Sequence, residues 1–169
     1  MTDSNPKPRI ALGADHAGYR AKEAIKRHLE KAGYEVEDLG TSSEQSVDYP
    51  DYAKAVAEKV ARGEAALGIG VCGTGIGMAI VANKVQGVRA AVAHDELTAR
   101  LAREHNDANL LTLGGRVVSE AQAARIVDVF LGARFAGGRH ARRVNKISQV
   151  ETGCGKRGGK TRPPGRSAP

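Results

Sequence analysis

The residues with the clearest chemical potential lie in one short stretch, where Cys72 is followed by glycines at alternate positions, Gly73, Gly75 and Gly77. An apolar run over 65–71 precedes this stretch, so the cysteine is expected where a strand ends and a helix begins. A helix N-terminus favours the thiolate, which is the reactive form of cysteine. The loop N–H groups suit an anionic oxygen. A tight turn beside a small, buried, unreactive cysteine is the alternative interpretation.

The same region contains the string Gly68-Ile-Gly70-Val-Cys-Gly73, which matches the dinucleotide-binding pattern G-x-G-x-x-G. That pattern places its glycines after a strand, whereas the first two glycines here are expected inside one. Asp95 lies at the distance of the acidic partner residue, but it is expected to cap a helix. A nucleotide-binding module is therefore the weaker hypothesis.

Two further groups have the chemistry of a catalytic or binding site. Histidine titrates near neutral pH, so His105, between a predicted helix and a predicted strand, suits a general acid or base; capping the helix end is its alternative role. Arg139 and Arg143 lie four residues apart in the first turn of the last predicted helix, where cations are disfavoured without an anion. Together they suit a phosphate, although a solvated basic face is the alternative.

The composition is typical of a globular protein of one domain, with 169 residues, 41% hydrophobic and 27% charged. The net charge is +7, and more than half of the excess falls in residues 151–169, where five basic residues accompany one acidic residue. We expect this tail to be solvated and disordered, and regard a basic RNA-associated protein as the less favoured class.

Other classes of protein are not expected from the sequence. The two cysteines have no second Cys or His at zinc-ligand spacing, which argues against a metal site. No apolar run approaches the roughly 18 residues of a membrane span. Residues 1–8 lack the apolar segment of a secretory signal, so we expect a cytoplasmic protein.

Hydrophobic periodicity predicts the elements that position these residues. Strands and helices alternate about five times, which indicates a parallel sheet covered by helices on both faces. Ligands bind such sheets beyond the carboxyl ends of the strands. The predicted strands span 9–13, 34–39, 65–71, 88–93 and 110–113, and the predicted helices include 21–32, 50–63, 95–105, 119–132 and 139–150. We expect one domain over 9–151, between a disordered start at 1–8 and a disordered basic tail at 152–169.

Several strings together resemble ribose-5-phosphate isomerase B, a family that also contains galactose-6-phosphate and allose-6-phosphate isomerases. The resemblance spans about residues 9–150 and rests on Gly13-Ala-Asp-His-Ala-Gly18, Asp48-Tyr-Pro-Asp-Tyr52, Val71-Cys-Gly-Thr-Gly-Ile-Gly-Met78, Ala82-Asn-Lys84, His105-Asn-Asp-Ala-Asn109 and Gly137-Gly-Arg-His140.

The resemblance implies an aldose–ketose isomerase of the pentose phosphate pathway, which interconverts ribose 5-phosphate and ribulose 5-phosphate through an enediolate. It implies no metal and no organic cofactor. The implied fold is a three-layer α/β/α sandwich with a five-stranded parallel sheet, Rossmann-like in arrangement. The implied active site is shared between two subunits of a homodimer; the sequence does not distinguish a dimer from a tetramer, or pentose from hexose phosphates as substrates.

By position, Cys72 resembles the base that moves a proton between C2 and C1, and His105 resembles the acid that opens the furanose ring. His140 is a second candidate for ring opening. Some family members use an acidic residue a few positions after the cysteine, but Ile76-Gly77-Met78 offers no carboxylate here. The other matching positions are Gly73, Thr74, Gly75, Ile76 and Gly77 at the enediolate oxygens, Asp15 and Tyr49 beside the sugar, Asn106 at a hydroxyl, and His16, Arg116, Arg139 and Arg143, mostly at the phosphate.

Overall fold

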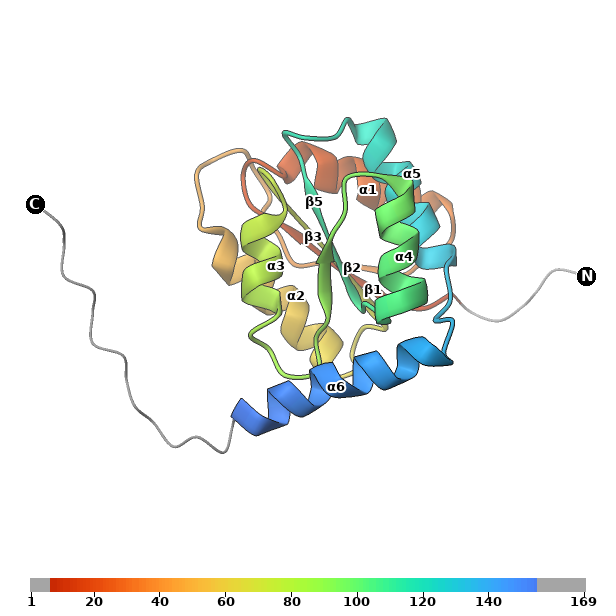
Figure 1. Ribbon diagram of the computed structural model, residues 1–169. Coiled ribbons are helices and arrows are strands. Elements are labelled where there is room, and N and C mark those ends of the chain that lie inside the picture. Colours follow the sequence, from red (N-terminus) through yellow and green to blue (C-terminus); the bar gives the residue numbers. More distant parts are fainter. Residues whose placement is uncertain (1–6, 155–169) are drawn as a thin grey trace, which may run out of the picture.

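The predicted strands form one parallel sheet in the order β2-β1-β3-β5-β4 (Figure 1). The computed structural model describes residues 7–154. The strands are β1 (Ile10–Ala14), β2 (Val36–Asp38), β3 (Leu67–Cys72), β4 (Ala90–Val92) and β5 (Leu110–Gly114). The helices are α1 (Tyr19–Lys31), α2 (Tyr49–Ala61), α3 (Ile76–Ala82), α4 (Glu96–Asn106), α5 (Glu120–Gly132) and α6 (Arg139–Cys154).

Helices cover both faces of the sheet, which confirms the predicted three-layer sandwich. One apolar core joins the sheet to α1, α4 and α5, and a second joins its other face to α2 and α3. The helices pack on the sheet through apolar residues that recur on one helix face. In α5, the buried residues of that face are Ala123, Ile126, Val127 and Phe130. The predicted capping box of Ser119 and Gln122 begins this helix.

The order of the strands places a topological switch point between β1 and β3. The chain leaves β1 toward β2 on one side, and it leaves β3 toward β4 and β5 on the other. Ala14 pairs with Val71, so the carboxyl ends of these two strands lie side by side. Such a topological switch point is where open α/β sheets bind ligands. Asp15 follows β1 here and Cys72 ends β3.

Helix α6 is longer than the sequence predicted, and the expected start of the tail at Thr152 is wrong. The helix continues to Cys154 because its last turn is held in place. The Thr152 hydroxyl donates to the carbonyl oxygens of Ser148 and Gln149 at 3.2 Å, and the Glu151 carboxylate accepts from the Gly87 N–H at 2.9 Å. In Figure 1, α6 lies across the end of the molecule where α4 terminates.

The remaining predicted tail, 155–169, and residues 1–6 of the predicted disordered start lie outside the described residues. Lys7 belongs to the described part, and its Nζ donates to the carbonyl oxygen of Ala32 at 2.6 Å. Among the described helices, none has the length and apolar character needed to cross a membrane.

Candidate active site

The Cys72 thiol is buried at the carboxyl end of β3, where the next turn of chain folds back over it. The Gly75 N–H donates to Cys72 Sγ at 3.2 Å. This turn requires a glycine, since Gly75 has φ of 79° and a Cβ there would lie 2.9 Å from the backbone of Leu113. The sulfur therefore faces a fixed backbone donor.

Side chains from other elements close around the loop 73–77. A Cβ at Gly77 would lie 2.6 Å from the Tyr49 ring, so this ring packs directly on the loop. The Arg116 guanidinium approaches Gly73 from the other side, where a Cβ would lie 3.3 Å from Nη1. Thr74 is exposed, and His94 Nε2 lies 2.9 Å from its carbonyl oxygen.

Asp15 and His16 follow β1 and lie at the same end of the sheet as this loop. The Asp15 N–H donates to the Val71 carbonyl at 3.1 Å, and its buried carboxylate accepts from the Gly18 N–H at 3.0 Å. His16 Nδ1 lies 3.2 Å from both the backbone nitrogen and the carbonyl oxygen of Val47. Asp15, His16, Cys72 and the loop thus occupy the topological switch point together.

A hollow of about 410 Å³ opens next to these residues. His16, Arg20 and Arg116 line it, and Ser119 at the start of α5 closes one side. Arg20 is paired with Glu44, with 2.5 Å between Nε and Oε1. Apart from that pair, the charged or titratable side chains that line the hollow are His16, Arg116 and Glu120. His16 and Arg116 suit an anionic group such as a phosphate, whereas the Glu120 carboxylate would repel it.

The other predicted site residues lie at the opposite end of the strands. Gly114, at the end of β5, pairs with Cys72, whereas Leu110, at its beginning, pairs with Gly68. His105 precedes that beginning, so it lies roughly 13 Å or more from Cys72 along the strand direction, at about 3.3 Å per residue. The members of this second group are His105, Asn106, Arg139, His140 and Arg143. One copy of the chain does not bring the two groups together.

Within the second group, His105 and His140 stack face to face, with ring centroids 4.2 Å apart and planes 6° apart. The Arg139 Nε–H donates to His140 Nε2 at 3.4 Å. Burial lowers the pKa of His140, and the nearby positive charges of His105, Arg139 and Arg143 lower it further. Arg139 and Arg143 are both exposed, as binding of an anion requires.

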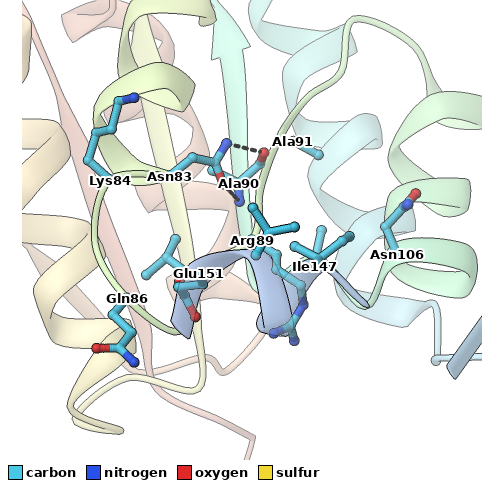
Figure 2. A pocket seen from close by; sticks show the side chains of 12 residues that line it. Asn83, Lys84, Gln86, Arg89, Ala90, Ala91, Asn106, Ile147 and Glu151 are labelled. Atoms are coloured by element: carbon cyan, nitrogen blue, oxygen red, sulfur yellow. Dashed lines mark hydrogen bonds between the residues drawn. The ribbon is translucent and has the colours of Figure 1, made fainter. Parts of the chain in front are cut away.

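A larger hollow of about 810 Å³, which was not predicted from the sequence, lies beside Asn106. Figure 2 shows Asn106 on one side of this hollow, Asn83 and Lys84 on the other, and Ile147 of α6 between them. Val150 of α6 also lines it, and most of its side chain is exposed. The sequence signal for this hollow was the spacing of Ile147 and Val150, two apolar residues three positions apart in the mostly polar helix α6.

The comparisons with known proteins agree with the predicted resemblance. The family model described as ribose/galactose isomerase matches residues 10–147. The chain belongs to the ribose/galactose isomerase family. It is 49% identical over 143 residues to ribose-5-phosphate isomerase B of Escherichia coli K12, covering 85% of this chain and 96% of that protein. It is 47% identical to a putative sugar phosphate isomerase of Bacillus subtilis, covering 85% and 97%.

Solved structures of family members have the same fold. The ribose-5-phosphate isomerase B of Clostridium thermocellum superposes with a TM-score of 0.85 at 53% identity, covering 86% of this chain and 99% of that one. The Mycoplasma genitalium enzyme, solved with bound ribulose-5-phosphate, superposes with a TM-score of 0.82 at 45% identity, covering 85% and 96%.

The dinucleotide-like string has a packing role in this family member. Gly68 and Gly70 lie inside β3, and a Cβ at Gly68 would lie 2.9 Å from Val56 of α2. Asp95 caps α4 by accepting from the Thr98 N–H at 2.7 Å, as predicted. The string therefore lets α2 approach the sheet, and its glycines are not placed after the strand as a dinucleotide site requires.

Proposed function

We propose that this chain is an aldose–ketose isomerase that interconverts ribose 5-phosphate and ribulose 5-phosphate, in an active site that a second copy completes. The observation that supports it most directly is the Cys72 loop at the topological switch point of a chain 49% identical to a ribose-5-phosphate isomerase B. The ribulose-5-phosphate bound to the Mycoplasma genitalium relative supports the substrate class.

In this proposal, isomerisation begins with opening of the furanose ring. His105 gives a proton to the ring oxygen while the O1 hydroxyl passes its proton to solvent water and the bond between C1 and the ring oxygen breaks, which produces the open-chain aldehyde. Asp15 and Tyr49 lie beside the sugar, and Asn106 contacts a hydroxyl. His140 is the alternative acid.

Cys72 then acts as the base for proton transfer between the two carbons. The thiolate removes the C2 proton and returns it to C1, while the O2 proton moves to O1, so that C2 becomes the ketone without any external oxidant. The intermediate enediolate carries negative charge, which the N–H groups and Thr74 of the loop 73–77 stabilise. Binding of the distant phosphate by His16, Arg116, Arg139 and Arg143 orients the reacting carbons.

A second copy explains how the two separated groups meet. In a twofold dimer, the Cys72 loop of one copy faces the His105 group of the other, and both sites are equivalent. Apolar side chains next to the loop support such an interface: Ile76, Ile80 and Leu97 each expose more than half of their surface. Val150 and Ile147 provide an exposed apolar surface beside the second group.

A coupled assay that follows formation of ribulose 5-phosphate from ribose 5-phosphate, with a chelator present, tests the proposed reaction. We expect steady turnover with ribose 5-phosphate and less with allose 6-phosphate or galactose 6-phosphate. Absence of isomerisation of every sugar phosphate by the folded protein would contradict the proposal. Faster turnover of a hexose phosphate would keep the reaction and change the substrate.

A further inference from the structure

The beginning of α6 holds His140 against the end of α4. Gly137 and Gly138 both have positive φ, 64° and 52°, which turns the chain sharply into the helix. Just before them, the Ala136 N–H donates to the Glu104 carbonyl oxygen at 2.9 Å. The position of His140 relative to α4 is therefore fixed by backbone contacts as well as by its own side chain.

The first two turns of α6 present different residues to the protein and to solvent. His140 is only 9% exposed, and Val144, four residues later on the same face, is also buried. Arg139 and Arg143 are exposed on the neighbouring face. His140 contacts the residue proposed to open the ring and one proposed to bind the phosphate, because it stacks on His105 and accepts a hydrogen bond from Arg139.

The hydrogen bond from Arg139 defines the protonation of the His140 ring. An arginine is always protonated in proteins, so its Nε–H is the donor and His140 Nε2 must carry the lone pair. The imidazole is then neutral, with its proton on Nδ1. A ring in this state has no proton on Nε2 to give to a sugar.

We propose that His140 is a positioning residue, a neutral imidazole that orients Arg139 through Nε2 and His105 through the ring stack. The inference rests on the proposed function, since it gives Arg139 and His105 their roles in phosphate binding and ring opening. His105 remains the acid that opens the ring, and His140 links His105 to Arg139.

The charges around His140 keep it neutral while the reaction proceeds. His105 faces it from α4, and Arg139 and Arg143 face it from its own helix. Among the described residues, the charged groups that act on the imidazole include no carboxylate. A neutral ring stacks favourably on a protonated one, whereas two protonated rings 4.2 Å apart repel each other. A neutral His140 can thus remain stacked on His105 during the proposed ring opening.

Nitrogen NMR of the imidazoles tests the protonation state without any substrate. In the wild-type protein at pH 7, we expect His140 to carry its proton on Nδ1 and to have an unprotonated Nε2. In Arg139→Ala, the population with the proton on Nε2 should rise. A wild-type His140 that is positively charged at pH 7, or protonated on Nε2, would overturn the inference even if the enzyme isomerises ribose 5-phosphate normally.

Two variants separate the functions of the ring in the isomerase assay. His140→Phe keeps a flat ring on His105 but cannot accept from Arg139, so KM should rise about tenfold with kcat within about threefold. His140→Gln keeps an acceptor but loses the stack, so kcat should fall about tenfold with KM within about threefold. Arg142→Ala, an exposed cation of the same turn, is the control and should match the wild type.

The pH dependence gives a further readout, because a protonated His140 cannot accept from Arg139. Because the pKa of His140 is lowered, the ratio of KM for His140→Phe to KM for the wild type should stay constant through the ordinary histidine range near pH 6.5 and fall toward one only at lower pH. The titration of the substrate phosphate cancels in this ratio. Parallel changes in kcat and KM in both variants, or wild-type kinetics in both, would overturn the inference. If His140→Phe does not fold, His140→Gln and the NMR measurement still decide.

Discussion

At the scale of single residues, the chemistry depends on what surrounds Cys72. The buried sulfur accepts a hydrogen bond from Gly75, and the Tyr49 ring packs on the loop that follows it. Among residues 72–77, Cys72 has the side chain whose ionised form, a thiolate, can act as a base. These contacts fit the proposed base better than an unreactive packing residue.

Replacing the thiol by a hydroxyl tests that role. Cys72→Ser keeps the size of the side chain, but a serine hydroxyl does not ionise near neutral pH. The variant should fold and bind sugar phosphate, and kcat should fall about 100-fold or more in the isomerase assay. Iodoacetamide should inactivate the wild type, with protection by substrate, and Cys154→Ser is the matched control. Near-normal turnover of Cys72→Ser would assign the thiol to packing.

The exposed arginines at the start of α6 are predicted to bind the substrate phosphate. Arg139→Ala and Arg143→Ala should each raise KM, because a charged hydrogen bond to phosphate contributes about 1.5–3 kcal/mol. Steady-state kinetics on ribose 5-phosphate measure the effect, with Arg142→Ala as the control. If neither substitution changes KM, the two arginines form only a solvated basic face.

At the scale of elements, a buried ion pair holds the turn beside the active site. Lys22 of α1 is 1% exposed, and its Nζ lies 2.8 and 2.7 Å from the two carboxylate oxygens of Asp38 at the end of β2. Asp38 also accepts from the Gly40 N–H at 3.0 Å. The Gly40 carbonyl in turn accepts from Ala14 at 2.6 Å, next to Asp15. The pair therefore connects α1 and β2 to the switch point.

Loss of this carboxylate should destabilise the fold in a pH-dependent way. Burial opposes ionisation of Asp38, but the hydrogen bonds from Lys22, Gly40 and Lys26 hold its pKa below the ordinary value. Its contribution is therefore present above about pH 4, the ordinary carboxyl range, and is lost as the pH falls through the lower folded-state value.

Urea unfolding of Asp38→Asn measures this contribution. At pH 7 the free energy of unfolding should fall by about 3 kcal/mol, because the buried Lys22 loses its main partner. The difference from wild type should shrink below about pH 4. Glu35→Gln is the control: it removes the exposed pair with Arg9, which solvent screens, so the free energy of unfolding should change little. A pH-independent difference would contradict the assigned role of the Asp38 charge.

At the scale of the whole molecule, local sequence signals predicted the elements better than the assembly of the site. The apolar periodicity of α5 and the capping by Ser119 and Asp95 are local, and they were predicted correctly. The strand order, the end of α6 and the hollow beside Asn106 depend on contacts between distant segments, such as that of Glu151 with Gly87. Periodicity alone carries no information on such contacts.

We predict that the C-terminal segment, residues 155–169, is dispensable for catalysis. The family model ends its match at residue 147, and the contacts that hold α6 include Glu151 and Thr152. Deletion of residues 155–169, rich in glycine and basic side chains, should therefore leave kcat and KM within about twofold. A tenfold loss of kcat/KM, about 1.4 kcal/mol, would place part of the catalytic machinery in this segment.

Subunit complementation tests most directly whether two copies form one active site. Cys72→Ser and His105→Asn should each have little activity alone. In a mixed dimer, one site combines the intact Cys72 of one copy with the intact His105 of the other. An equal mixture, refolded together, should recover about a quarter of wild-type activity, as expected for random pairing in a twofold dimer. Cys72→Ser mixed with the double variant is the control and should stay inactive. Recovery near a quarter would support the shared site, whereas mixed dimers with no more activity than the separate variants would contradict it.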